Sequence, residues 1–206
     1  MTHDLSAQLL GAFQRRHACH LFEADKALTQ EQLDFILEAG RLSPSSFGLE
    51  QWKFLVLTSA AQKAAMQAAC FNQPQVGSAG ALVVILAKLA ELHPDHPYAQ
   101  KLLRREYPGE AFAPALKNYR GFHAATDIKA WSASQCHIAA ANMMTAATAL
   151  GIDSCAIGGF LPEQVRGLLG INPAQYEVAL VLALGTCAQP PGEKQRLPLA
   201  ELVEYR

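Results

Sequence analysis

Two short, continuous apolar runs place the tightest limit on how this chain can fold. They span Ala81–Ala87 and Val178–Leu184, and both are far shorter than the about 20 apolar residues that a membrane-spanning helix needs. Uninterrupted runs of this length are typical of strands that are buried on both faces of a sheet. We therefore expect two buried strands, at Ala81–Lys88 and Glu177–Leu184, inside a globular fold.

Helical periodicity and capping signals fill much of the remaining chain. Thr29 with Gln32, and Ser59 with Gln62, match the capping-box pattern that starts a helix. Further helices are expected at residues 5–15, at 132–150 before Gly151, and from Pro162 to Gly170. A further buried strand is expected at 53–58 and a short strand at 154–157. Because helices and strands alternate without internal repeats, the pattern indicates an α/β or α+β fold.

The chain is long enough for one well-filled domain, and we expect residues 1–206 to form it. The segment Leu89–Thr126 differs from the rest, since it holds four prolines, mixed charge and several aromatic residues. Its apolar content is too low to predict a core of its own. We therefore interpret it as an excursion or lid on the single domain.

Composition excludes several classes of function. Half of the residues are hydrophobic and the formal net charge is −1, which argues against disorder and against nucleic acid as the main partner. The N-terminus lacks the basic start and apolar core of a signal peptide. The five cysteines are odd in number and never spaced C-x-x-C, so we expect reduced thiols, no disulfide framework and a cytoplasmic protein.

Common catalytic and binding motifs are absent from the sequence. No G-x-G-x-x-G lies between a strand and a helix, so a Rossmann nicotinamide domain is unsupported. His17-Ala-Cys-His20 resembles half of a metal site, but the sequence contains no second cluster of Cys and His to supply the remaining ligands. Cys136 and His137 are neighbours on a helix and point in different directions. We therefore predict no metal site, no side-chain nucleophile and buried structural cysteines.

Three separated segments together carry the residue types of a phosphate site. They are Arg15–Phe22 after the first helix, Leu42–Ser46 before Gln51-Trp52, and Lys194–Pro198 near the C-terminus. Arg16, Lys194 and Arg196 could converge on one phosphate dianion, and the hydroxyls of Ser45 and Ser46 suit phosphate or ribityl oxygens. Taken alone, these segments are equally typical of a helix end, a turn and a surface tail. The prediction of a phosphate site therefore rests on the order of the three segments along the chain.

That order resembles the nitroreductase family of FMN enzymes. Six motifs occur in the same order as in the family, between Gln14 and Pro198. They are R-R-H after the first helix, S-P-S-S before Q-W, an Asn after the next helix, A-L-G-I-D, an I-x-G-F turn and K-x-R-L-P. The resemblance implies an α+β sandwich with a central, mainly antiparallel sheet flanked by helices. It also implies an intertwined homodimer in which both chains line each FMN site.

The resemblance further implies which residues contact the cofactor. Arg16 and Arg196 would bind the FMN phosphate, assisted by Lys194. His17 and Ala18 would supply backbone and side-chain contacts beside the ribityl chain, and His20 would lie at the pyrimidine edge. The partner subunit would supply Pro44, Ser45 and Ser46. The other implied contacts are Asn72, Gln75 and Gln135, with Ile157, Gly158 and Gly159 as a backbone turn at flavin N5.

Structural interpretations stay open for three of these residues. Asn72 could cap a turn before Pro74, Gln135 could be an ordinary exposed helix residue, and His20 could be a surface histidine. Tyr119 and Phe122 are candidates for an aromatic lid over the substrate.

The implied activity is hydride transfer from NADH or NADPH through flavin N5 to small quinone-like or nitroaromatic acceptors, by a ping-pong mechanism. The sequence departs from the family at Gly158, where Glu is common, at Gln75, where Lys often assists, and at Ala18, where Ser is common. These departures leave the acceptor and the choice of nicotinamide open. The alternatives are a flavin-binding sensor or storage protein with little turnover, and a flavin-processing or dehalogenating member of the same superfold.

Overall fold

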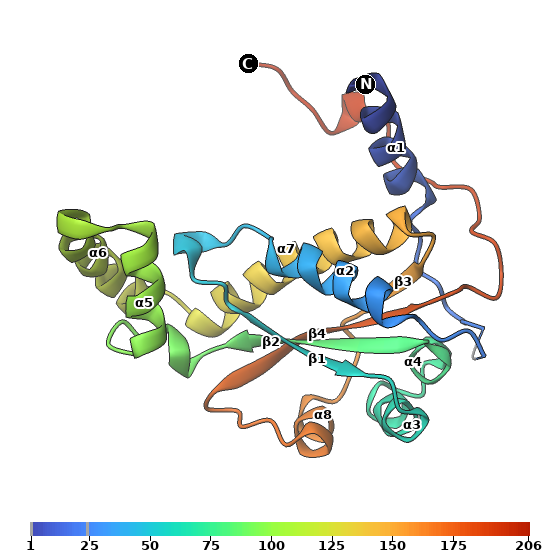
Figure 1. Cartoon of the computed structure of the whole chain (residues 1–206), viewed down its shortest axis with the longest axis horizontal. Helices are drawn as coiled ribbons and strands as arrows, with labels where there is room; N and C mark the ends of the chain where they lie inside the picture. The colour runs from blue at the N-terminus through green and yellow to red at the C-terminus, as the bar shows by residue number, and fades with distance from the viewer. Residues whose placement is uncertain (1, 24) are drawn as a thin grey trace.

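The computed structural model describes residues 2–23 and 25–206, and an antiparallel sheet lies at its centre (Figure 1). The sheet has the order β1-β2-β4-β3, with strands β1 Trp52–Leu57, β2 Ala81–Lys88, β3 Asp153–Ile157 and β4 Tyr176–Gly185. The two apolar runs are the central strands β2 and β4, and they pair from Ala81 opposite Leu184 to Lys88 opposite Tyr176. The two buried strands expected from these runs are confirmed.

Helices cover both faces of this sheet. α2 (Gln30–Arg41) and α7 (Ile128–Ala149) lie on one face, and α3 (Ala60–Ala69), α4 (Pro74–Ser78) and α8 (Pro162–Leu169) lie on the other (Figure 1). Successive residues of β2 serve the two cores in turn: Leu82 and Val84 pack with Met66 of α3, while Val83 and Ile85 pack with Met143 of α7. The side-chain alternation of a strand thus fills two cores at once, and the expected α+β sandwich is confirmed.

Local signals fix most of the helix ends. Thr29 and Gln32 form the complete capping box, whereas Ser59 only accepts a hydrogen bond from the Gln62 amide. Gly151, which follows the C-cap Leu150 of α7, and Gly170, which directly follows α8, take left-handed conformations. Within the described part of the chain, no helix is long and apolar enough to cross a membrane.

Two elements differ from the expectation. β1 is an edge strand with Lys53 and Val56 exposed, so it is not the buried strand expected there. α7 begins four residues early, because the Asp127 carboxylate caps it by accepting a hydrogen bond from the Ala130 amide. The first helix is also longer than expected and spans Thr2–Arg15 (α1).

The segment after β2 is more ordered than its sequence indicated. It contains α5 (Pro97–Glu106) and α6 (Phe112–Ala125), which pack around Leu92, Leu103 and Tyr119. The apolar and aromatic residues of the segment cluster with Leu49 and Trp131 from outside it, so this third core is shared with the rest of the chain. The function of the segment as a lid stays a prediction.

The aromatic residues proposed as a lid lie in this third cluster. Tyr119 is completely buried, and its hydroxyl donates a hydrogen bond to the Leu92 carbonyl at 2.5 Å. Phe122 is half-buried beside Phe47 and Trp131. Only Phe122 therefore offers surface to a substrate in this arrangement.

The cysteines correct the sequence analysis at one point. Cys19 and Cys187 form a disulfide with a Cα–Cα distance of 5.8 Å, so the expectation of reduced thiols is wrong for this pair. Cys19 follows α1 and donates its amide hydrogen to Ser154 on β3, while Cys187 follows the neighbouring strand β4. Sheet pairing brings the two together across a sequence separation of 168. Cys70, Cys136 and Cys155 are free and buried, as expected.

Candidate functional site

The end of α1 and the C-terminal segment form a cluster of three cations, Arg16, Lys194 and Arg196. The Lys194 ammonium donates a hydrogen bond to the carbonyl of Phe13 at 2.7 Å and another to the carbonyl of Arg16. These bonds fix the C-terminal segment against the last turn of α1. The three cations then line one open pocket of about 330 Å³. The convergence expected from the sequence is therefore present within a single chain.

The cation cluster has no acidic partner within residues 2–23 and 25–206. No described carboxylate forms an ion pair with Arg16, Lys194 or Arg196. Burial, and then the charges of Arg16 and Arg196, lower the pKa of Lys194. Like charges held together in this way repel one another, and a bound anion would relieve the repulsion. The cluster is suited to a phosphate group.

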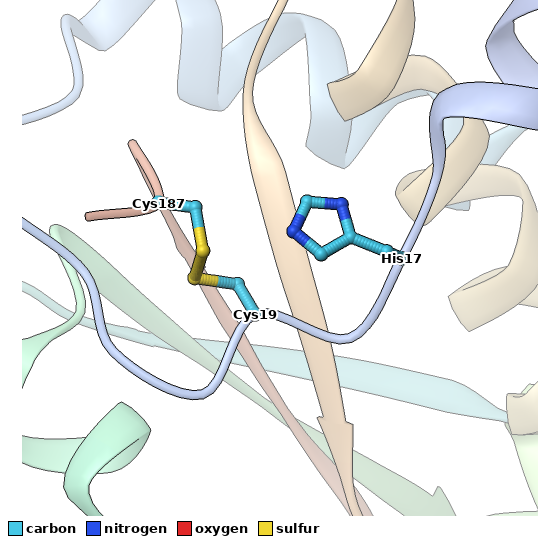
Figure 2. A group of neighbouring side chains, drawn as sticks. All are labelled: His17, Cys19 and Cys187. Atoms are coloured by element: carbon cyan, nitrogen blue, oxygen red, sulfur yellow. A yellow bond between two sulfur atoms is a disulfide. The ribbon is translucent and has the colours of Figure 1, made fainter. Parts of the chain in front are cut away.

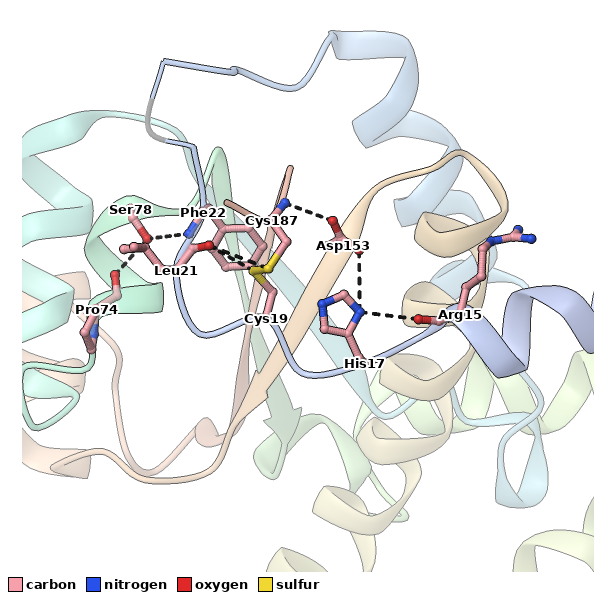
Figure 3. The surroundings of a disulfide bond; sticks show 9 residues. All are labelled: Arg15, His17, Cys19, Leu21, Phe22, Pro74, Ser78, Asp153 and Cys187. Atoms are coloured by element: carbon pink, nitrogen blue, oxygen red, sulfur yellow. Dashed lines mark hydrogen bonds and ion pairs between the residues drawn. A yellow bond between two sulfur atoms is a disulfide. The ribbon is translucent and has the colours of Figure 1, made fainter. Parts of the chain in front are cut away.

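His17 turns away from this cluster. Its Nδ1 lies 3.3 Å from the Arg15 carbonyl oxygen and 3.8 Å from Oδ1 of Asp153, and its ring faces the disulfide (Figure 3). The expected side-chain contact of His17 with a ribityl chain does not fit this orientation, although His17 is among the residues that line the cationic pocket beside Ala18. His20 is exposed and lines an adjacent pocket with Cys187.

A second part of the candidate site lies at the far end of β3. This strand begins at Asp153 beside His17 and ends at Ile157, about 13 Å further along. Gly158 and Gly159 follow as an exposed turn, and a Cβ atom at Gly158 would meet nothing within 4 Å. The structure therefore leaves open space where many relatives were expected to carry a carboxylate.

Gln73 holds this turn in place, and the sequence analysis missed it. Its side-chain amide donates hydrogen bonds to the carbonyls of Gly159 at 2.8 Å and Cys70 at 2.9 Å. Asn72, next to it, is exposed in a left-handed conformation. Gln75 is 6% exposed and its amide donates to the Gln73 side chain at 3.0 Å, and its contact with a cofactor stays a prediction. The position of Gln73 before Pro74 was the only signal for its role.

The remaining predicted residues form a separate group near the start of α7. The Gln135 side-chain oxygen accepts a hydrogen bond from the Ser46 amide at 3.0 Å, and the Ser45 hydroxyl accepts one from Glu50. Pro44 precedes them on the same loop. This group and the end of α1 lie toward opposite ends of α7 (Figure 1). One chain therefore holds two partial sites.

Comparison with known proteins gives one consistent family. The model of the nitroreductase family matches residues 13–186. Two staphylococcal relatives both carry the name "Putative NAD(P)H nitroreductase". The one from Staphylococcus aureus (strain USA300) is 32% identical, over 98% of this chain and 97% of the relative. The one from Staphylococcus epidermidis is 36% identical, over 91% of each.

Solved structures share the fold over almost the full length. A nitroreductase-like protein from Streptococcus mutans superposes with a TM-score of 0.84, 22% identity and complete coverage of both chains. A nitroreductase-type protein from Exiguobacterium sibiricum, solved in complex with FMN, gives a TM-score of 0.80 and 21% identity, over 96% of this chain and 97% of that one.

Proposed function

The chain belongs to the nitroreductase family, and we propose that it is a homodimeric, FMN-dependent oxidoreductase. In this proposal it passes hydride from NAD(P)H to small quinone-like or nitroaromatic acceptors. The observation that carries the proposal is the cluster of Arg16, Lys194 and Arg196 with no acidic partner among the described residues. The names of the staphylococcal relatives and the FMN complex of the Exiguobacterium protein support it.

The residues of the candidate site fit an FMN molecule in outline. Arg16, Lys194 and Arg196 would hold the phosphate, and the backbone of His17 and Ala18 would lie beside the ribityl chain. FMN, when bound, would supply the redox chemistry by accepting hydride from NAD(P)H and passing it to the acceptor. The turn after β3, held by Gln73, would present backbone amides and open space for the ring.

Buried thiols offer no competing chemistry. Burial raises the pKa of Cys70 to about 11 and that of Cys136 to about 12. Both thiols are therefore protonated near neutral pH and are poor nucleophiles. This supports the expectation that a bound cofactor, and no cysteine nucleophile, carries the reaction.

The cofactor proposal predicts a yellow protein that NAD(P)H bleaches without oxygen. Chromatography of the released chromophore should identify FMN, and steady-state NAD(P)H oxidation should be faster with menadione or nitrofurazone than without an acceptor. Comparing the two acceptors ranks quinone against nitro reduction. A protein that stays yellow under anaerobic NADH and NADPH would be a flavin-binding protein, and the oxidoreductase proposal would be wrong.

The dimer is proposed from exposed apolar surface at both ends of the chain. In α1, Leu5, Leu9 and Leu10 are 67%, 49% and 57% exposed. In the C-terminal tail, Leu199 and Leu202 are 71% and 65% exposed. α1 and this tail extend away from the layered body (Figure 1). A second copy would cover these apolar side chains, and its Ser45, Ser46 and Gln135 would complete the site that begins at Arg16.

Light scattering should therefore give twice the chain mass of 22.3 kDa. Leu10→Asp should shift the protein toward monomer and weaken FMN binding, because a carboxylate would be buried in the interface. Leu168→Asp is the matched control, since Leu168 is 49% exposed on α8, away from α1. Circular dichroism checks that both variants fold. A wild-type monomer at micromolar concentration would contradict the dimer.

A further inference from the structure

A buried histidine nitrogen without a partner lies beside the disulfide. Nε2 of His17 is shielded from solvent and forms no hydrogen bond among the described residues. The ring lies against the bond between Cys19 and Cys187, and its free nitrogen points toward the two sulfur atoms (Figure 2). One ligand atom from each of the three residues lies within 4.8 Å of the other two. A buried polar atom usually has a partner, so this one needs an explanation.

The surroundings of His17 fix its tautomer. Nδ1 faces the Arg15 carbonyl oxygen at 3.3 Å and the Asp153 carboxylate at 3.8 Å, and both are acceptors (Figure 3). Nδ1 therefore carries the hydrogen of the neutral ring, which leaves a lone pair on Nε2. The Asp153 carboxylate is itself fixed, because its Oδ2 accepts a hydrogen bond from the Cys187 amide at 2.9 Å. A histidine that binds a metal is typically oriented by such a carboxylate or carbonyl on its other nitrogen.

We propose that the reduced Cys19 and Cys187 bind Zn²⁺ together with Nε2 of His17. A dithiol reductant supplies two electrons and two protons, breaks the S–S bond into two thiols and becomes a disulfide itself. Zn²⁺ then replaces the two thiol protons, forming two Zn–S bonds and one bond to Nε2, and a water molecule takes the fourth position. The same residues thus alternate between a covalent cross-link and a metal site, according to the redox state.

The backbone around these residues holds them in place without the S–S bond. The Cys19 amide donates to the Ser154 carbonyl at 3.1 Å, and the Ala188 amide donates to the Leu21 carbonyl at 2.9 Å. For tetrahedral zinc with Zn–S bonds of about 2.3 Å, the two sulfurs need to separate to about 3.8 Å. Rotation of the two side chains can supply this movement, so the site needs no refolding.

The third ligand of the proposed zinc site lies far from the other two in the sequence. No second cluster of Cys and His lies near His17-Ala-Cys-His20 in the sequence. Cys187, which follows β4, is brought beside it by the pairing of β3 with β4. In a reducing compartment, which the predicted cytoplasmic location would provide, the dithiol form would dominate. The zinc site does not depend on the proposed FMN chemistry, and it can be tested on protein freed of any flavin.

The test uses Co²⁺ as a spectroscopic substitute for Zn²⁺. Flavin-free protein is reduced with a dithiol, desalted without oxygen and titrated with Co²⁺. We expect one Co²⁺ per chain with a thiolate-to-metal charge-transfer band and tetrahedral visible bands, and we expect Zn²⁺ to displace it. Oxidised protein should show no such band, because its sulfurs carry no thiolate.

Variants assign the ligands. Cys187→Ser should abolish the charge-transfer band, and His17→Gln, which keeps both cysteines, should weaken Co²⁺ binding at least 10-fold. Asp153→Asn should weaken it about 10- to 100-fold, as expected for a residue that orients a ligand. Cys70→Ala is the control and should bind like wild type, since Cys70 is buried and free.

Three results would overturn the zinc site. The first is a reduced wild-type protein without a thiolate band. The second is a band of equal strength in Cys187→Ser. The third is loss of the band in Cys70→Ala, which would place the metal on another thiol. If Cys187→Ser does not fold, His17→Gln still decides, because unchanged affinity in that variant contradicts the proposed ligand set.

Discussion

Arg16→Ala is expected to purify as a largely colourless protein. Arg16 directly follows the last residue of α1 and lines the cationic pocket with Lys194 and Arg196. Its guanidinium can donate two hydrogen bonds to one phosphate, and charged hydrogen bonds of this kind contribute about 1.5–3 kcal/mol. Because about 1.4 kcal/mol corresponds to a tenfold change in affinity, the loss should weaken FMN binding roughly 10- to 100-fold. Desalting would then remove most of the cofactor.

Arg104→Ala is the control for this variant. Arg104 lies on α5, where its guanidinium stacks on the Phe112 ring at 4.2 Å from the centroid, and it is absent from the pockets that Arg16, Lys194 and Arg196 line. The measurements are the ratio of flavin to protein absorbance after desalting and the dissociation constant from quenching of FMN fluorescence. Stoichiometric FMN in purified Arg16→Ala would place the phosphate elsewhere in the molecule.

Much of the fold was predictable because its signals are local. The continuous apolar run of β2 predicts a strand with both faces buried, and the structure buries every residue from Ala81 to Ala87. Thr29 and Gln32 predict the start of α2, because the two side chains satisfy backbone groups that only a helix leaves open. The third cluster was not predictable from Leu89–Thr126 alone, because the aromatic residues of this segment pack against Leu49 and Trp131, which lie outside it.

Only those parts of the candidate site that follow from the order of motifs along the chain were predictable. The resemblance indicated that Arg16 and Arg196 converge, and the structure joins them through Lys194 and the carbonyls at the end of α1. The orientation of His17 was not predictable, because it depends on Asp153 at the start of β3. The pairing of Cys19 with Cys187 was equally hidden, since five cysteines without a repeated spacing allow many pairings.

Reduction of the disulfide should produce the largest change in stability. The cross-link joins residues that are 168 apart in the sequence, so it restricts most of the unfolded chain. Loop-closure entropy gives about 5 kcal/mol for such a loop, although 2–4 kcal/mol is typical of measured disulfides. At about 2–4 °C per kcal/mol for a chain of this size, we expect the melting temperature to fall by roughly 10 °C. The comparison needs flavin-free protein, a chelator and a fixed protein concentration.

A double variant, Cys19→Ser with Cys187→Ser, serves as the control. It should melt like reduced wild type and should not respond to the reductant. Thiol titration of denatured protein checks the starting state, with three thiols expected before reduction and five after it. Five thiols in unreduced protein, or a melting temperature that reduction does not change, would contradict a stabilising cross-link.

The same experiment separates a simple cross-link from the proposed zinc site. If the reduced residues bind Zn²⁺, adding the metal in place of the chelator should restore part of the lost stability. Zn²⁺ at 100 times its dissociation constant would contribute about 2.7 kcal/mol, provided that the unfolded chain binds it weakly. His17→Gln keeps the disulfide, so it should lose stability on reduction like wild type, but with binding at least 10-fold weaker it should recover no more than about 1.4 kcal/mol at the same Zn²⁺ concentration. Wild type and His17→Gln differ only at position 17. If Zn²⁺ restored the same stability to both, the cysteines would bind the metal without His17.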